Sequence, residues 1–260
     1  LQRRTLLTAM LAAPFVTAHA QVIDLSDAIN KAGRQRMLSQ RMGKAWLALL
    51  QHVVKTSAQL VLDKSMALFD RQLVELKGFA PTPDVQATYS KLEAAWSEYK
   101  TALVGKAPAR DGAAALLQLD AKVLALAHQG TQQYEAALAK PVGKLVNVAG
   151  RQRMLSQRMA KFYLAATLPV DASVATAEIG KARTEFSSAM ELLRNAPEAT
   201  LRIKDELLLA DAQWVFFDMA LKQLQEGAQR PRPIVDVFVS SENLLTVMDR
   251  VTGLYSALKA

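Results

Sequence analysis

Apolar side chains recur at intervals of three and four residues along almost the whole chain, and alternating β-branched segments are scarce. This spacing places the apolar residues on one face of an α-helix. Residues with high helix propensity dominate the same segments, and short stretches rich in glycine and proline interrupt them. The pattern predicts eight helices, over residues 24–54, 57–78, 83–104, 112–139, 143–168, 172–195, 197–226 and 233–258.

Four long helices joined by short loops are typical of an up-down four-helix bundle. We therefore expect an all-α fold with two tandem bundles, the first over residues 21–140 and the second over residues 141–260. The linker around residues 140–143 is short, so the fifth helix begins close to where the first one began. This arrangement predicts two bundles packed side by side as a pseudo-two-fold dimer within one chain.

An internal repeat supports this division. The sequence GRQRMLSQRM occurs twice without a difference, at Gly33–Met42 and at Gly150–Met159, a spacing of 117 residues. A period of this length suits a small domain and is too long for a solenoid repeat. Weaker matches follow at the same spacing or one residue more, and they include Lys44 with Lys161, Phe69 with Phe186, and Trp96 with Trp214.

On a helical wheel the arginines of the motif separate into two classes. Arg36 shares a face with small and apolar residues, whereas Arg34 and Arg41 point away from that face. In the second copy Arg153 lies on the equivalent packing face. A charge on a packing face needs a partner, because an unpaired buried charge is costly.

Two interpretations of these arginines remain open. In the first, a carboxylate from another helix pairs with each arginine as part of the structure, the candidates being Asp120, Asp211 and Asp218. In the second, Arg36 and Arg153 meet across the pseudo-two-fold axis and a small oxyanion removes their repulsion, since guanidinium is a planar donor fork. The second interpretation requires that the two arginines face each other without a carboxylate. Its predicted ligand-binding residues are Arg36, Arg153, Gly33, Gly150, Ala32, Ala149, Gln40 and Gln157.

The first twenty residues are predicted to be a secretory signal peptide. Arg3 and Arg4 precede an apolar run from Leu6 to Ala18, and a small-residue cleavage site follows it. An uncleaved membrane anchor is the alternative, although the run is shorter than the roughly 20 residues that span a bilayer. Export by the general secretory or the twin-arginine route predicts a periplasmic protein.

Composition excludes several classes of function. The chain has no cysteine, so disulfides, thiol catalysis and cysteine metal sites are excluded. Within the mature sequence His52 and His128 are isolated, and neither a phosphate-binding loop nor a nucleophile elbow is present. We therefore expect no enzyme activity, no metal and no cofactor. The net charge of +8 is compatible with an anionic ligand, but the export signal and the lack of interleaved aromatic residues argue against nucleic acid.

The motif also carries a resemblance to known sensor domains. The string Asn-x-Ala-Gly-Arg-Gln-Arg-Met-Leu-Ser-Gln-Arg-Met-x-Lys resembles the start of the N-terminal domain in the type IV pilus methyl-accepting chemotaxis transducer (PilJ-type) family, and it is similar to the periplasmic nitrate sensor domain of the NarX type. In nitrate sensors a dimeric bundle holds one nitrate on its axis. The resemblance thus implies that Arg36 and Arg153 clamp an anion beside Gly33 and Gly150.

These observations predict an exported, soluble, sensor-like protein that binds a small oxyanion, nitrate or nitrite, between its two repeats. Unlike the membrane-anchored sensors, the chain shows no later apolar segment long enough to span a bilayer, nor a kinase or signalling module. The alternative is a structural protein without a small ligand, which docks onto a periplasmic receptor or onto a partner in a pilus, chemotaxis or nitrate-respiration system.

Overall fold

The computed structural model describes residues 21–168, 172–224 and 231–258, and the regular structure within these ranges is entirely helical. The elements are α1 (Leu25–Leu50), α2 (Lys55–Phe79), α3 (Pro83–Val104), a 3-10 turn η1 (Arg110–Gly112), α4 (Ala113–Leu138), α5 (Pro141–Ala166), α6 (Ala172–Asn195), α7 (Leu201–Leu221) and α8 (Pro231–Ser256). The predicted all-α fold is confirmed. The predicted signal peptide lies outside the described residues.

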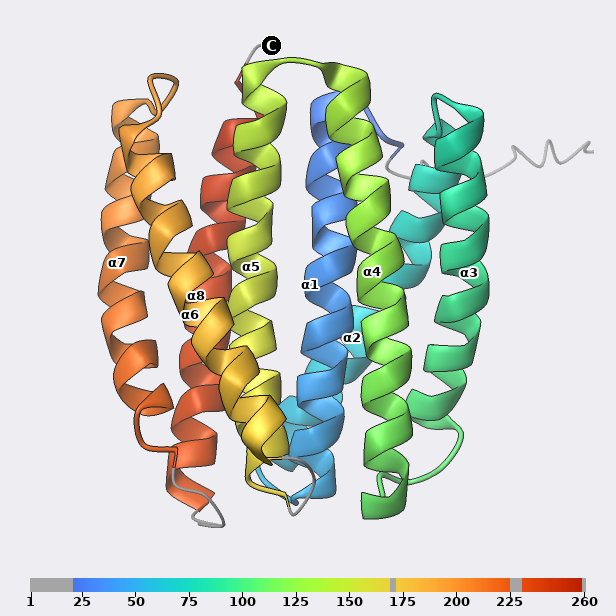
Figure 1. The fold of residues 1–260 in the computed structure, drawn as a ribbon, viewed down its shortest axis with the longest axis vertical. Helices are drawn as coiled ribbons and strands as arrows, with labels where there is room; N and C mark the ends of the chain where they lie inside the picture. Colours follow the sequence, from blue (N-terminus) through green and yellow to red (C-terminus); the bar gives the residue numbers. More distant parts are fainter. Residues whose placement is uncertain (1–20, 169–171, 225–230, 259–260) are drawn as a thin grey trace, which may run out of the picture.

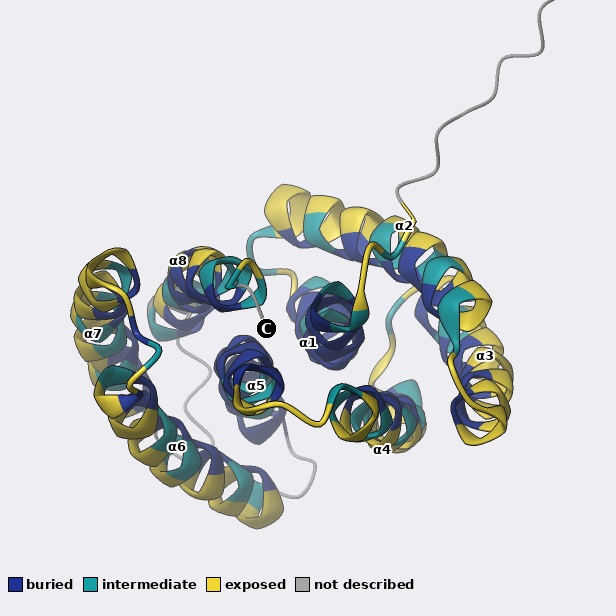
Figure 2. Cartoon of the chain, turned by 90° about the horizontal axis from the view of Figure 1, so that it is seen from above, coloured by how far each residue is buried: buried dark blue, intermediate teal, exposed yellow. Residues whose placement is uncertain are grey.

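The first helix of each repeat lies at the centre of the molecule (Figure 1). α1 and α5 run in the same direction, and the contact between them is the most extensive of any pair of helices. Seen from above, α4 and α8 flank this pair, while α2 with α3 and α6 with α7 form the two outer sides (Figure 2). The two repeats therefore pack side by side through their first helices, as the sequence predicts.

Most helix boundaries lie within two residues of the expected ones, and the larger differences are at the end of α1 and at both ends of α7, which ends at Leu221 and not at residue 226. α1 ends at Leu50 and not near residue 54, because His52 and Val54 adopt left-handed backbone conformations with φ of 58° and 42° that a right-handed helix does not accommodate. α7 begins at Leu201 and not at residue 197, because the side chain of Thr200 caps the helix by accepting a hydrogen bond from the Ile203 amide.

Aromatic packing repeats in both halves of the chain. Phe69 stacks on Trp96 with ring centroids 4.2 Å apart, and Phe186 stacks on Trp214 at 4.4 Å. These are the residues that the repeat aligns, so the two copies share tertiary packing as well as the motif. The faint sequence similarity outside the motif thus preserves the positions of the largest core side chains.

The last helix of each repeat is held by an equivalent tyrosine. The hydroxyl of Tyr134 in α4 donates to the Leu76 carbonyl, and the hydroxyl of Tyr255 in α8 donates to the Leu193 carbonyl. The two acceptors are 117 residues apart, but the two tyrosines are 121 residues apart. α4 and α8 therefore correspond at a spacing of 121 residues, which identifies equivalent positions in these helices.

Glycine allows the central helices to approach each other. A Cβ atom placed at Gly33 would lie 3.8 Å from the Cα atom of Gly150, 3.1 Å from Nη2 of Arg36 and 3.5 Å from Nη2 of Arg153. Any side chain at this position must therefore displace the arginines or separate the helices.

We expect Gly33→Val to lower the free energy of unfolding by about 1–3 kcal/mol, because it overfills a packed interface. The control is Gly180→Ala in α6, where an added Cβ meets no atom within 4 Å. This change should stabilise the protein by about 0.5–1 kcal/mol through the higher helix propensity of alanine. Urea unfolding measures both. A Gly33→Val protein as stable as the parent would contradict the close crossing.

Candidate functional site

Two fully buried arginines meet where α1 crosses α5. Arg36 and Arg153 are both 0 % exposed. The Nη2 group of Arg36 donates to the Asn147 carbonyl at 3.2 Å, and the Nη2 group of Arg153 donates to the Asn30 carbonyl at 2.9 Å. Each arginine thus reaches from its own helix to the backbone of the other. The structure brings the two predicted arginines together, beside Gly33 and Gly150.

The two arginines differ in the partner of their Nη1 groups. Arg153 donates to Oδ1 of Asp249 at 2.5 Å, whereas Arg36 contacts Nδ1 of His128 at 3.2 Å. Asp249 and His128 are 121 residues apart, so they occupy equivalent positions in α8 and α4. At one position of the pseudo-symmetric pair the arginine faces a carboxylate, and at the other it faces an imidazole.

Asp249 neutralises Arg153. Burial tends to raise the pKa of Asp249, but the nearby Arg153 and Arg34 lower it to about 2, so the carboxylate is charged at neutral pH. Arg34 also donates to the same carboxylate oxygen at 2.9 Å. Arg153 therefore has a carboxylate in direct contact, whereas no ion pair to Arg36 is found among the described residues.

Arg36 has no comparable counter-charge. Burial, together with repulsion from Arg151 and Arg153, lowers the pKa of Arg36 to about 9, although the more distant carboxylates of Glu135 and Glu185 act to raise it. Arg36 is therefore still protonated at pH 7. Its hydrogen-bond partners among the described residues are an imidazole nitrogen and a backbone carbonyl, and its Nε group has none. A buried positive charge that is solvated only by neutral groups is the main electrostatic feature of the interface.

The contact with Arg36 fixes the protonation state of His128. Arginine can only donate hydrogen bonds, so Nδ1 of His128 is the acceptor and the ring proton is on Nε2. Burial and the charges of Arg36 and Arg151 lower the pKa of His128 to about 4. The imidazole is therefore neutral at pH 7.

The carboxylates expected from the sequence pair with other cations. Asp120 forms a buried ion pair with Lys161, and it also accepts a hydrogen bond from Gln40 at 2.7 Å. Asp211 pairs with Arg194, and Asp218 pairs with Arg183 and Lys222. The expectation that a carboxylate from another helix pairs with a packing-face arginine is thus met at Arg153, but by Asp249 and not by any of the three named aspartates. The requirement of an arginine pair without a carboxylate is accordingly not met at Arg153.

Further polar residues of the motif tie the central helices to α4 and α8. Gln157 donates to the Ser241 carbonyl at 2.9 Å, and Lys44 donates to the Ser241 hydroxyl and to Glu242 at 2.9 and 2.6 Å. Gln40 and Gln157 thus bind the neighbouring helices, and their hydrogen bonds do not reach the arginines. Ala32 and Ala149 are buried in the interface and add no polar group.

The outward arginines reach acidic partners, as the helical wheel predicts. Arg34 and Arg41 of α1 pair with Asp249 and Glu242 of α8, whereas Arg151 and Arg158 of α5 pair with Glu185 and Glu178 of α6. The acids come from α8 in one case and from α6 in the other. At the positions of α4 that are equivalent to Asp249 and Glu242 stand His128 and Ala121.

A surface groove ends at His128. It lies between α4, α5 and α6, has a volume of about 400 Å³, and is lined by His128 together with Arg151, Arg158 and Lys181. Glu178 and Glu185 line the same groove. Neither Arg36 nor Arg153 lines it, so the imidazole of His128 separates the groove from the guanidinium of Arg36.

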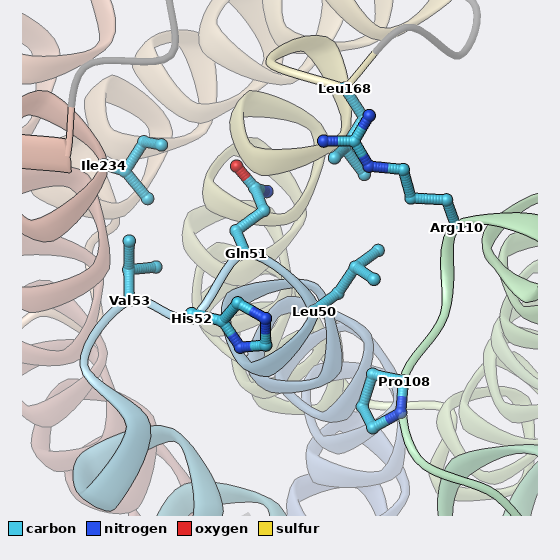
Figure 3. A pocket seen from close by; sticks show the side chains of 8 residues that line it. All are labelled: Leu50, Gln51, His52, Val53, Pro108, Arg110, Leu168 and Ile234. Carbon is cyan, nitrogen blue, oxygen red and sulfur yellow. The ribbon is translucent and has the colours of Figure 1, made fainter.

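A second cavity, of about 460 Å³, lies where α1 ends (Figure 3). Gln51, His52 and Arg110 contribute its polar side chains, and the Gln51 amide is itself bonded to the Leu164 carbonyl. Position 52 lies 16 residues beyond Arg36, which corresponds to about 24 Å along a helix. This cavity is therefore distinct from the arginine pair.

Sequence reasoning missed the two residues that make the arginines unequal. In the sequence His128 is isolated, and nothing in the pattern marks Asp249 as a partner of Arg153. The motif spacing of 117 residues does not align these positions. His128 and Asp249 are aligned instead by the pattern Thr-x-x-Tyr, which occurs at 131–134 and at 252–255, a spacing of 121 residues.

The described residues contain no helix that is long and apolar enough to cross a membrane. They also contain no group of three or more histidine, cysteine, aspartate or glutamate side chains that could hold a metal ion. No curated protein and no solved structure is significantly similar to the chain.

One family model matches, and it does so twice. The model described as type IV pili methyl-accepting chemotaxis transducer N-term (PilJ) matches residues 20–126 and 134–251, and each segment contains one copy of the motif. The described family is one of sensor domains and not of catalysts. The chain therefore belongs to the PilJ family of transducer N-terminal domains and carries the family's domain in two copies.

Proposed function

We propose that this protein is a periplasmic sensor-like module that binds a small planar oxyanion, nitrate or nitrite, at Arg36 in the interface of its two repeats. The observation that carries the proposal is the difference between two equivalent arginines. Arg153 has the carboxylate of Asp249, whereas Arg36 has the neutral imidazole of His128. The second repeat thus places a carboxylate in direct contact with its arginine, and the first repeat does not.

The contact between Asp249 and Arg153 indicates how an oxyanion would bind to Arg36. The carboxylate of Asp249 lies against the Nη1 group of Arg153, and a carboxylate has the same planar arrangement of charged oxygens as nitrite. The pseudo-symmetric position beside Arg36 is that of the His128 ring. An oxyanion that takes this position would accept from Nη1 of Arg36 in the way that Asp249 accepts from Arg153.

Relief of a buried charge would supply the driving force. Arg36 is fully buried, lies near Arg153, and has an Nε group without an acceptor. An anion in contact with it would gain charge-assisted hydrogen bonds in an environment of low dielectric constant. Nitrate and nitrite suit the guanidinium fork better than chloride does, because two of their oxygens can accept in parallel.

The groove between α4, α5 and α6 offers a route to the site. Its basic side chains, Arg151, Arg158 and Lys181, favour the approach of an anion, although Glu178 and Glu185 limit this attraction. His128 is the residue that stands between the groove and Arg36. A rotation of its ring into the groove would admit the ligand without separating α1 from α5.

The other predicted site residues take supporting roles in this proposal. Gly33 and Gly150 keep the helices close, so that the guanidinium of Arg153 is also near the anion. Gln40 and Gln157 hold α4 and α8 in place through Asp120 and Ser241. Ala32 and Ala149 leave the crossing free of larger side chains. Arg36 is the principal ligand-binding residue, and Arg153 contributes through its charge.

Nitrate should stabilise the protein against heat relative to chloride at equal ionic strength, because a ligand that binds only the folded state raises its stability. His128→Asp introduces the carboxylate that the second repeat already has. It should raise the melting temperature without nitrate by roughly 2–6 °C, given about 2–4 °C per kcal/mol for a protein of this size. It should also abolish the effect of nitrate.

His52→Asp is the matched control, since it makes the same change of charge in the separate cavity at the end of α1. This variant should keep the response to nitrate. Arg36→Gln should lose it. A parent protein whose melting temperature is the same in nitrate, nitrite and chloride would overturn the proposal in favour of the docking interpretation. A nitrate response that survives in His128→Asp would do the same.

Binding should also take up a proton at His128. Without ligand the pKa of His128 is lowered to about 4, and a bound anion would raise it by favouring the imidazolium. Affinity for nitrate should therefore increase as the pH falls from 7 to 5, by at most about tenfold per pH unit. Calorimetry in buffers of different ionisation enthalpy measures the proton uptake. His128→Asn should remove the pH dependence, and an affinity that rises with pH would contradict this account.

A further inference from the structure

Helix α7 exposes a continuous row of large apolar side chains. Those more than half exposed are Leu201, Leu208, Leu209, Val215, Phe216 and Met219. We call these six residues the α7 stripe. The helix lies at the outer edge of the molecule, with its opposite face packed on α6 and α8 (Figure 2). Contiguous apolar surface of this kind on a soluble protein marks an interaction site.

The first repeat shows that the fold does not require this stripe. α3 is the equivalent of α7 at a spacing of 118 residues, as Trp96 and Trp214 show. The positions of α3 that match residues 208, 209, 215, 216 and 219 carry Ser90, Lys91, Ser97, Glu98 and Thr101. The same place in the same fold is thus polar in one repeat and apolar in the other. The fold of the repeat therefore does not need the α7 stripe, which indicates that the stripe contacts another molecule.

Four residues of the α7 stripe, Leu201, Leu208, Val215 and Met219, fall in the spacing of a two-helix seam, and Leu209 and Phe216 flank it. Residues 201, 205, 208, 212, 215 and 219 follow one another at alternating intervals of four and three, which is the heptad pattern of a coiled coil. Apart from Asp205, all of these positions are apolar. We propose that a second copy of this chain docks on the α7 stripe, with the two α7 helices antiparallel.

Charge complementarity favours this occupant and this direction. In an antiparallel pair that places residue 212 opposite 208, and 219 opposite 201, Lys204 faces the partner's Asp218. Arg202 then lies against the partner's Phe216, a favourable cation–π arrangement. On one side of the two-fold axis Leu209 meets the partner's Leu209. On the other side Asp211, which pairs with Arg194 of its own chain, meets the partner's Asp211, so one like-charge contact stands against the two symmetric contacts between Lys204 and Asp218. In a parallel pair Lys204 would lie beside the partner's Leu209 and Asp211 beside the partner's Phe216, and neither contact is an ion pair.

The size of the stripe also fits a helix pair. At 1.5 Å per residue it extends about 27 Å from Leu201 to Met219. A symmetric contact uses the same patch on both molecules, so the stripe of each molecule is buried by the stripe of the other. The resulting dimer would place its two arginine sites far from the contact, one in each chain.

Sedimentation velocity over a concentration series up to about 100 µM tests the proposal, since this range extends well above micromolar dissociation constants. The parent chain should show a reversible monomer–dimer equilibrium. The double variant Leu208→Ser with Phe216→Glu, which introduces the residues that α3 carries, should weaken dimerisation at least tenfold. Val74→Ser in α2, another exposed apolar position, is the control and should dimerise like the parent. A monomeric parent, or a dimer that the double variant leaves intact, would overturn the proposal.

Cysteine cross-linking tests the direction, because the chain has no cysteine of its own. With a short bismaleimide, Leu209→Cys should form a covalent dimer alone. Leu201→Cys should not do so alone, but it should cross-link when mixed with Met219→Cys. Circular dichroism shows whether each variant is folded. Cross-linking of Leu201→Cys alone would indicate a parallel pair and contradict the antiparallel arrangement.

Discussion

The crossing of α1 and α5 is the constraint on which the rest of the structure depends. It places two fully charged guanidinium groups in one desolvated interface, where Arg36 and Arg153 each bond to the backbone of the opposite helix. Like charges in such an environment repel strongly, so the surrounding helices must supply compensation. α8 does this with Asp249, while α4 supplies the neutral His128. Much of the asymmetry between the repeats follows from this difference.

Duplication within one chain makes such asymmetry available. In a homodimer of identical subunits both arginines would have the same partner, whereas a fused pair can change each half separately. Here one half has a carboxylate beside its arginine, and the other has an imidazole beside a surface groove. The outer helices show the same divergence, because α3 is polar where α7 is apolar. The two copies thus share one fold and differ in the surface of their third helix.

The sequence predicted the helices, the duplication and the meeting of Arg36 with Arg153, because each depends on local periodicity or on an identical motif. It did not predict the partners of the arginines. Asp249 and His128 lie in helices whose spacing differs from that of the motif, and only tertiary packing places them at the crossing. The early end of α1 at Leu50 was also missed, since left-handed residues such as Val54 leave no signal in the pattern.

The central claim is that an anion replaces the contact between Arg36 and His128. Nitrogen-15 NMR of the imidazole rings measures this directly, because the whole chain contains three histidines. Without nitrate, His128 should show a protonated Nε2 and an unprotonated Nδ1. Addition of nitrate at pH 6 should shift both nitrogens of His128 towards the imidazolium values and leave His52 unchanged. A His128 ring that is insensitive to saturating nitrate and nitrite would contradict the account.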